Sequence, residues 1–380
     1  MTTASGAATD DDVPRRAVVR LARFGFEDGA RAARLLAHPA LGLWDLERNE
    51  PADPEAGPVI SALARAGDPD LAVRSLARLV EALDATDPDG GLAAGLLARL
   101  RGSSAVRSRL LAVLGASSGL ADHLAAHPAD WVVLDTEDRV AVRPSPQELE
   151  QQMLFAVGAD PDDPPWGVRL GTAAPDADPA RVRDLRHAYL RAVLAVAGRD
   201  LGDGVPADEV AAELADIAGA VLTAGLALAV AEQPADATAC RLAVIALGKT
   251  GGRELNYVSD VDVVFVAEPL NPGEDDAAAL ASATRVAGAL MRICGQAAWE
   301  VDAALRPEGR AGVLVRSLAG HRAYYEQWAS TWEFQALLKM RPVAGDPSLG
   351  REYVDALWPL VWKAGDRTGF VAEIQAMRRR

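Results

Sequence analysis

The sequence predicts an α+β protein in which a small mixed β-sheet is embedded in a largely helical chain. Through about residue 235 of the 380, apolar side chains recur at the three- and four-residue spacing of amphipathic helices. After Pro234 the pattern changes to short apolar runs at 241–247 and 258–267, which are typical of buried strands. Helical periodicity resumes at Leu318. One α+β module therefore lies between helical segments.

The helical part begins after a short tail. Residues 1–12 are mainly Ala, Ser, Thr and Asp without apolar periodicity, so we expect a disordered tail. The range 13–235 is expected to be helical, and its clearest helix start is Asp68, a capping residue, with Pro69 at the first helical position. The apolar side chains of this helix recur at spacings of three and four: Leu76, Leu79, Val80 and Leu83.

Two shorter helices should follow, and then a connection. The leucine-rich segment 110–114 is expected to end at Gly115, because glycine readily adopts the left-handed conformation of a helix C-terminus. The next helix, 120–126, should stop before Pro128, since a residue that precedes proline avoids helical angles. The range 135–180 is rich in proline and aspartate and predicts a connection between helical subdomains, after which the helical pattern returns.

The strands belong to a module that we expect over 236–345. The remaining residues, 346–380, predict the start of a C-terminal helical region, and the chain stops in an unfinished helix, which suggests truncation. Within the module the pattern predicts strands at 241–247 and 258–267, a helix at 276–297, and strands at 299–305 and 312–317.

Composition narrows the class of protein. Half of the residues are hydrophobic, which is enough for a sizeable core. Only Cys240 and Cys294 are present, so no disulfide framework is expected. No apolar run looks long enough to span a bilayer, and residues 1–12 show no signal-peptide pattern. The sequence therefore predicts a cytoplasmic protein that does not act at a membrane.

The net charge is also informative. The formal charge of −15 argues against a broad nucleic-acid-binding face, because phosphate backbones attract Lys and Arg. The balance is uneven along the chain: from Val301 onward there are 12 Lys and Arg against 9 Asp and Glu, which leaves 27 against 45 before it. A mildly basic C-terminal part is compatible with small anionic ligands, and no nucleic-acid partner is expected.

Asp260 and Asp262 form the most informative motif. Side chains alternate faces along a strand, so these carboxylates are expected to point the same way and to share one hard cation. Asp302, in the third predicted strand, adds another carboxylate. Three carboxylates on adjacent strands are costly to hold together unless a cation neutralises them. A bare Asp-x-Asp is more often a pair of solvated acids, but this context favours a site for Mg²⁺ or Mn²⁺.

Small and basic residues around this motif are candidates for phosphate contacts. Gly251 and Gly252 lack a Cβ and would let the backbone approach phosphates closely. Four cations are candidate phosphate clamps by charge and position, each with a surface ion pair as an equally good alternative. They are Lys249, Arg253, Arg306 and Arg341.

Two other motifs resemble functional sites less well. The tripeptide 248–250, Gly-Lys-Thr, matches the end of a phosphate-binding loop, but the first glycine of that motif would fall at Ala243, inside a predicted strand. His123 and His127 are four residues apart on a predicted helix and could ligate zinc. No Glu or Cys completes a ligand set nearby, so surface or capping histidines are the better interpretation.

Residues 248–265 resemble the nucleotidyltransferase signature of the bifunctional glutamine synthetase adenylyltransferase/adenylyl-removing enzymes, in their N-terminal half. That signature looks like G-K-x-G-x-x-E-L-N-x-x-S-D-x-D-x-x-F. This sequence supplies Gly248, Lys249, Gly251, Glu254, Leu255, Asn256, Ser259, Asp260, Asp262 and Phe265. The similarity runs from about residue 100 to the end, with departures at Thr250 and Ala304.

The resemblance implies a nucleotidyltransferase-like catalytic domain over 236–345, with Ser259 among the phosphate-binding residues. The N-terminal half of such enzymes removes AMP from a tyrosine of glutamine synthetase by phosphorolysis, in control of nitrogen assimilation. Inorganic phosphate attacks the AMP phosphorus, tyrosine leaves, and ADP is released. Glutamine synthetase, phosphate and an adenine nucleotide are the implied partners, and a PII-type signal protein and glutamine are candidate regulators.

Two other functions stay open at this point. The same three acids would serve ATP-dependent adenylylation of glutamine synthetase, which is the opposite chemistry. A catalytically silent nucleotidyltransferase-like module could instead bind glutamine synthetase or a regulator without turnover. Asn256 after Glu254-Leu255 and the long helical lead-in favour the AMP-removing half.

Overall fold

The computed structural model describes residues 13–87, 91–135, 143–162, 167–168, 178–234, 237–271, 273–365 and 370–377. The expected disordered tail, 1–12, lies outside this part of the chain. The chain divides into two compact units. The first comprises Met1–Val142 with Leu190–Ala207, and the second comprises Arg143–Tyr189 with Asp208–Arg380.

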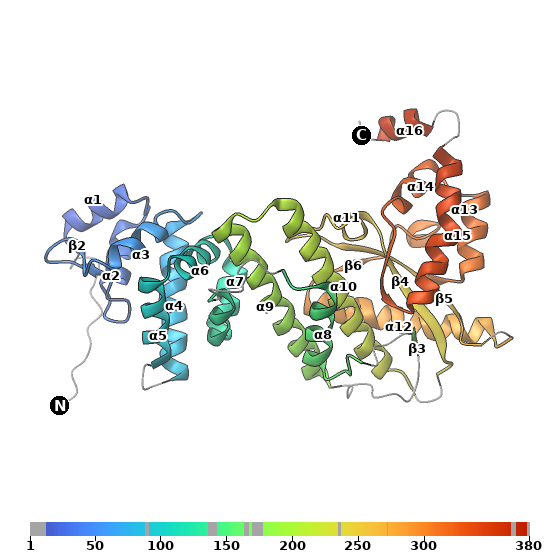
Figure 1. Ribbon diagram of the computed structural model, residues 1–380, viewed down its shortest axis with the longest axis horizontal. Helices are drawn as coiled ribbons and strands as arrows, with labels where there is room; N and C mark the ends of the chain where they lie inside the picture. Colours follow the sequence, from blue (N-terminus) through green and yellow to red (C-terminus); the bar gives the residue numbers. More distant parts are fainter. Residues whose placement is uncertain are drawn as a thin grey trace. The chain divides into compact units, whose positions relative to one another are not determined.

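The first unit is built from short helices, drawn in blue to cyan in Figure 1. Helix α4 is at its centre and packs against α2, α5, α6 and α7. Its start is confirmed, since the Asp68 side chain accepts a hydrogen bond from the Leu71 amide and Pro69 occupies the first turn. The elements are α1 (Arg15–Arg23), α2 (Gly29–Ala37), β1 (Trp44–Asp45), β2 (Glu50–Pro51), α3 (Ala56–Leu63), α4 (Pro69–Thr86), α5 (Gly91–Gly102), α6 (Ser104–Ala116), α7 (Ser118–Ala126) and the 3₁₀ helix η2 (Pro128–Leu134). The last part of α9 (Pro179–Asp203) completes the unit.

Two helix ends in this unit test the sequence prediction. Helix α7 ends at His127, before proline, as expected. The expected end of the preceding helix at Gly115 is wrong, because α6 continues to Ala116 and the chain turns at Ser117. A Cβ on Gly115 would lie 2.6 Å from the Cβ of Ala66, so this glycine serves close packing against the start of α4.

The connection expected over 135–180 contains a helix that the sequence prediction missed. Helix α8 (Pro146–Val157) begins with a capping box, in which Ser145 and Glu148 exchange hydrogen bonds between side chain and backbone. The prolines and acids that suggested a loop include the start signals of this helix, Pro146 and Glu148. Residues 136–142, 163–166 and 169–177 of that range lie outside the described part of the chain.

The second unit contains the mixed sheet that the sequence predicts. Strand β4 (Cys240–Ala246) is antiparallel to β3 (Gly167–Val168), β5 (Val261–Pro269) and β8 (Arg341–Gly345). Strand β5 runs parallel to two short strands, β6 (Val301–Asp302) and β7 (Val315–Arg316). Strands β3 and β8 were not predicted, because both are short and lack an apolar run.

Helices cover the sheet on both faces (Figure 1). On one side, α12 (Asp276–Ala297) packs on β4 and β5, and α10 (Ala207–Ala231) contacts α12, where a Cβ on Gly225 would meet the Leu290 side chain at 2.9 Å. On the other side are α13 (Leu318–Gln327), α14 (Thr331–Leu337) and α15 (Pro347–Gly365), and α16 (Phe370–Met377) follows. The buried side chains of α13, α14 and α15 share one core with β4 and β5, which includes Ile245, Val264, Val266, Tyr325, Phe334, Tyr353 and Leu357.

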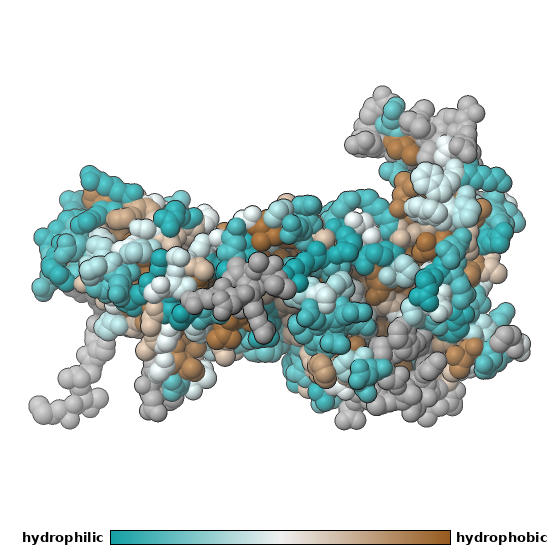
Figure 2. Space-filling view, viewed as in Figure 1, coloured by the Kyte–Doolittle hydropathy of each residue, from teal (hydrophilic) through white to brown (hydrophobic). Residues whose placement is uncertain are grey.

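The expectation that no apolar run is long enough to span a bilayer is wrong on length, since α10 and α12 both meet that criterion. In α10, 94% of the apolar window is buried inside the protein, as in the core helix of a globular domain. In α12 the buried share is 44%. The face in view in Figure 2 is mainly hydrophilic, with hydrophobic residues only in scattered groups. These two helices are therefore weak evidence for a membrane protein.

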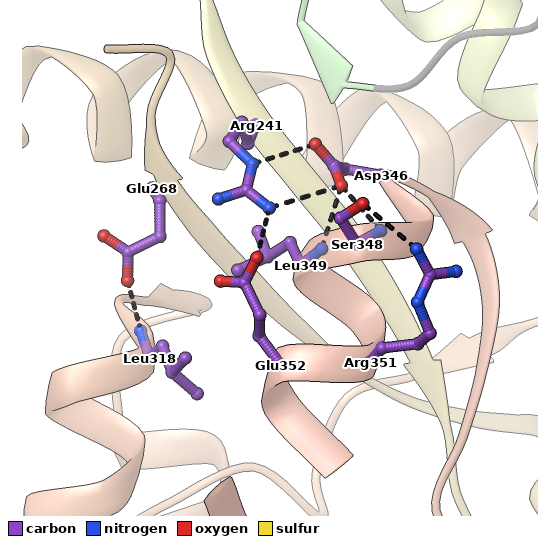
Figure 3. A network of polar contacts seen from close by, with 8 residues as sticks. All are labelled: Arg241, Glu268, Leu318, Asp346, Ser348, Leu349, Arg351 and Glu352. Atoms are coloured by element: carbon purple, nitrogen blue, oxygen red, sulfur yellow. Dashed lines mark hydrogen bonds and ion pairs between the residues drawn. The ribbon is translucent and has the colours of Figure 1, made fainter. Parts of the chain in front are cut away.

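An ion-pair network joins the beginning of the inner strand β4 to α15 (Figure 3). The guanidinium of Arg241, on β4, donates to Asp346 at 2.9 Å and to Glu352 at 2.8 Å. Asp346 also accepts from the Ser348 and Leu349 amides at the start of α15. Burial works against the charge of Asp346, but these hydrogen bonds outweigh it and hold the pKa of the carboxyl below its ordinary value. The network fixes α15 against β4.

Candidate metal and phosphate site

Three carboxylates meet where β5 begins. Asp262 of β5 is paired in register with Asp302 of the parallel strand β6, so their side chains are neighbours on one face. Asp260 lies just before β5, and one carboxylate oxygen from each of the three residues lies within 4.8 Å of the others. Asp260 is exposed, and the other two are half-buried. The structure thus brings together the three acids that the sequence singled out.

The electrostatics of Asp262 indicate what this cluster needs. Burial raises the pKa of the Asp262 carboxyl above its ordinary value, and the negative charges of Asp260 and Asp302 raise it further. The positive charge of Lys249 acts in the opposite direction. Carboxylate oxygens are the ligands that Mg²⁺ and Mn²⁺ prefer, and a bound cation would remove the repulsion among the three acids. The donor set therefore fits a hard divalent cation.

Gly248 lies against the Asp262 carboxylate and leaves no room there for a Cβ. Its φ angle is +52°, and a Cβ at this position would lie only 2.2 Å from the Asp262 carboxylate Oδ2. The neighbouring Leu247 amide donates to the main-chain oxygen of Asp262 at 2.9 Å. Gly248 was recognised as a signature residue and as part of the Gly-Lys-Thr tripeptide, but it was not among the predicted site residues. The available signal was its place in the signature, two residues after the end of a strand.

The predicted glycine pair lies in the short helix α11 (Gly248–Gly251) and at its end. A Cβ on Gly251 would lie 2.0 Å from the main-chain oxygen of Lys339, and a Cβ on Gly252 would lie 2.7 Å from the Lys339 side chain. Both glycines therefore allow the segment before β8 to pack closely on α11. An approach to phosphate through the same glycines stays a prediction.

Lys249 and Ser259 lie beside the carboxylates. The Lys249 ammonium donates to the Asn256 side-chain oxygen at 3.2 Å, and its charge acts on Asp262. The Ser259 hydroxyl donates to the Asp260 carboxylate at 3.4 Å. Lys249 is therefore the predicted cation that the structure brings to the acidic cluster.

The three predicted arginines are engaged by the protein itself. Arg306 donates to three main-chain oxygens, those of Ala303, Gly312 and Arg310, and so holds the loop after β6 together. Arg341 donates to the main-chain oxygens of Thr250 and Gly251 at 2.8 and 3.2 Å. Arg253 forms an ion pair with Asp216 of α10 at 2.7 Å.

Arg310 was not among the predicted cations, but its guanidinium approaches the acidic cluster. Its guanidinium lies 3.9 Å from the Asp302 carboxylate, and its side chain is 82% exposed. Such an exposed cation can move toward an incoming anion at little cost. No sequence motif indicates Arg310, because its contact depends on how the loop after β6 folds.

The prediction of surface or capping histidines is confirmed for His127, which is exposed and caps the end of α7, and is wrong for His123. His123 is buried, and its Nε2 lies 2.9 Å from the Asp130 carboxylate. Arg191 also approaches Asp130, at 3.3 Å. The His123 and His127 rings lie 5.1 Å apart between centroids. Asp130 thus partners His123, whereas the sequence interpretation had considered only Glu and Cys as further ligands.

Comparisons with known proteins agree with the sequence signature. The family model of glutamate-ammonia ligase adenylyltransferase matches residues 107–355. The curated bifunctional glutamine synthetase adenylyltransferase/adenylyl-removing enzyme of Streptomyces coelicolor is 49% identical over 368 residues, which cover 95% of this chain and 33% of that protein. The proteins of the same description from Nocardia farcinica and Corynebacterium glutamicum are 46% and 42% identical, over 96% and 88% of this chain. The chain spans about one third of the length of these relatives.

Proposed function

The chain belongs to the glutamate-ammonia ligase adenylyltransferase family, and from this premise we propose that it removes AMP from an adenylylated tyrosine of glutamine synthetase by phosphorolysis. One observation carries the proposal: Asp260 and Asp262, which belong to the segment that matches the family signature, converge with Asp302 at the start of β5. The relatives carry two activities by name, adenylyl transfer and adenylyl removal. Because the chain spans only about a third of their length, its activity and its direction are both part of the proposal.

The reaction needs charge neutralisation and alignment more than it needs covalent chemistry. An oxygen of inorganic phosphate attacks the phosphorus of the tyrosine-bound AMP, and the bond from phosphorus to the tyrosine oxygen breaks. The products are ADP and the unmodified tyrosine side chain of glutamine synthetase, whose oxygen takes up a proton. When bound, Mg²⁺ or Mn²⁺ would supply neutralisation of the phosphate charges at the three carboxylates. Residues of the chain itself fix the positions of the carboxylates. Gly248 leaves space for the Asp262 side chain, and the register of β5 with β6 places Asp302 beside Asp262.

Basic side chains near the acids would orient the phosphates. Lys249 is the predicted clamp that lies beside Asp262, and Arg310 can swing from Asp302 toward an anion. Ser259 can donate to a phosphate oxygen from its place beside Asp260. The other three predicted clamps also stay in the proposed phosphate set: Arg253, Arg306 and Arg341. Each guanidinium has five N–H groups, so those that do not contact the protein could still donate to a phosphate.

The direction of the reaction rests on the resemblance to the AMP-removing half, in particular Glu254-Leu255-Asn256. Adenylylation of glutamine synthetase by ATP is the alternative, since the same carboxylates serve both reactions. In this proposal the protein works in the cytoplasm on glutamine synthetase, and a PII-type signal protein and glutamine are candidate regulators in nitrogen assimilation.

The test is incubation with adenylylated glutamine synthetase, Mg²⁺ and phosphate, with detection of ADP. ADP release that rises with phosphate and saturates is the expected result, and Asp302→Asn should abolish it. Asp355→Asn, which removes an exposed carboxylate of α15, is the matched control and should stay active. Labelling of unmodified synthetase by ATP with pyrophosphate release would assign the opposite direction. Binding of the synthetase without turnover in either direction would leave a regulatory binding module.

A further inference from the structure

A buried acid outside the carboxylate cluster gathers basic residues around the signature loop. Asp216 lies on α10, and only 2% of its side chain is exposed. Its carboxylate Oδ2 accepts hydrogen bonds from the guanidinium groups of Arg143 and Arg253. Arg143 precedes α8, and Arg253 follows α11, so one carboxylate connects three segments that are far apart in sequence. A buried charge of this kind is costly unless paired, and breaking the pairing is costlier still.

Arg253 itself has an unusual backbone. Its φ angle is +58°, and among the described residues only Asn49 and Glu308 are other non-glycine residues with positive φ. A side chain with a Cβ is disfavoured in this conformation, so surrounding contacts must hold it there. The Arg253 side chain forms an ion pair with Asp216. Asp216 therefore sets where the end of the signature loop lies.

The loop transmits this position to the carboxylate cluster. The amides of Gly251, Gly252 and Glu254 donate to the main-chain oxygens of Leu247, Gly248 and Lys249, so residues 247–254 form one hydrogen-bonded unit. Gly248, in this unit, is in contact with the Asp262 carboxylate, and Lys249 places its charge beside Asp262. A displacement at Arg253 would therefore move both groups that define the environment of Asp262.

Arg341 makes the same loop sensitive to the charge of Asp216. It donates to the main-chain oxygens of Thr250 and Gly251 from the other side of the loop. Burial lowers the pKa of Arg341, the positive charge of Arg253 lowers it further, and the negative charge of Asp216 opposes both. Without that carboxylate, Arg143, Arg253 and Arg341 would be like charges around one short loop, and their repulsion would push it away from α10.

We propose that Asp216 is a positioning residue for the acidic cluster: through Arg253 it fixes the 247–254 loop, and so the places of Gly248 and Lys249 beside Asp262. The activity readout of this inference rests on the proposed function, whereas its structural readout does not. Asp216 contacts no reacting group; it acts through Arg253.

The first experiment needs no activity. Hydrogen exchange of the amides of residues 251–254 should accelerate at least about tenfold in Asp216→Asn, because their acceptors lie in the loop that Asp216 fixes. Glu209→Gln is the matched control, an exposed acid on the same helix, and should leave these amides unchanged. Mn²⁺ affinity, measured by electron paramagnetic resonance of free Mn²⁺, should weaken in Asp216→Asn and not in Glu209→Gln. Unchanged loop exchange in a folded Asp216→Asn protein would overturn the proposal.

The second experiment is a double-mutant cycle on AMP removal, with Asp216→Asn, Arg253→Ala and the double variant. If Asp216 acts through Arg253, each single variant should lower kcat about tenfold, KM for phosphate should change less than kcat, and the double variant should be no worse than either. Independent, multiplying losses would overturn the proposal. Arg253 is 43% exposed on its side chain, so Arg253→Ala remains a test if Asp216→Asn fails to fold. A wild-type protein without phosphate-dependent ADP release would refute the proposed function, and loop exchange would still decide the role of Asp216.

Discussion

Substitution of Gly248 by alanine tests whether the acidic cluster depends on the glycine beneath it. The new Cβ would lie 2.2 Å from the Asp262 carboxylate Oδ2, far inside contact distance, and the residue would keep a φ of +52°. Alanine in the left-handed region costs about 1–2 kcal/mol. Overpacking of a filled site adds roughly 1–3 kcal/mol. We therefore expect a loss of about 2–5 kcal/mol in unfolding free energy, unless Asp262 moves to relieve the overlap.

Movement of Asp262 would transfer the cost from stability to activity. The carboxylate would have to withdraw by about 1 Å to reach ordinary contact, and a misplacement of that size can lower turnover about 10²-fold. Two assays follow these outcomes: thermal unfolding, where a loss of this size lowers Tm by on the order of 10 °C, and Mn²⁺-dependent AMP removal. At least one of them must show the loss.

The control is the same substitution at a glycine with free space. Gly288 lies on the exposed side of α12, and a Cβ there would have no atom within 4 Å. Gly288→Ala should be neutral or stabilise the protein by about 0.4–1 kcal/mol, with unchanged activity. If Gly248→Ala matches Gly288→Ala in Tm, Mn²⁺ affinity and turnover, the position of Asp262 does not depend on a glycine at 248.

Four further predictions concern single side chains. Asp260→Asn or Asp262→Asn should abolish AMP removal while far-ultraviolet circular dichroism stays native, and full activity in either variant would refute the site assignment. The folded-state pKa of Asp262 is raised above 3.8, so ionisation of Asp262 destabilises the metal-free protein as pH rises through that pKa. Asp262→Asn should therefore have a higher Tm than wild type by a margin that grows with pH and vanishes below the unfolded-state pKa of Asp262. Arg306→Ala removes three donors to main-chain oxygens and should cost about 1–3 kcal/mol in urea unfolding. Because Arg306 belongs to the proposed phosphate set, KM for phosphate should also rise, and an unchanged KM would leave Arg306 a structural residue only. Asp346→Ala should destabilise the protein by about 1–3 kcal/mol, because it removes the cap of α15 and the ion-pair partner of Arg241. The folded-state pKa of Asp346 is lowered, so its contribution to stability should disappear as pH falls through that pKa. An equal Tm difference from wild type at acidic and neutral pH would contradict this.

The arginines show where sequence reasoning reached its limit. Arg253, Arg306 and Arg341 were chosen because cations near an acidic motif favour phosphate contacts. In the structure their guanidinium groups hold the loops around the site, and a phosphate contact through their remaining donors stays a prediction. Arg310, whose role no motif suggested, lies beside Asp302. Position along the chain identifies a cation near the site, but the partner of a long side chain depends on which segments pack around it.

The sequence by itself determined the local features. The spacing of Asp260 and Asp262, the apolar strand, and the signature residues predicted a mixed sheet carrying an acidic cluster. The expectation that both acids lie on the strand was wrong for Asp260, which precedes β5, so alternation along the strand places only Asp262. Capping residues such as Asp68 fixed helix starts.

Only the tertiary structure decided what lies around that cluster. Pairing of Asp262 with Asp302 depends on the register of two strands separated by α12. The need for glycine at 248 depends on the Asp262 side chain, and the place of Arg253 depends on Asp216 in a different helix. These contacts join residues far apart in sequence, and each forms only when the helices and the sheet pack together, so no local pattern could specify them.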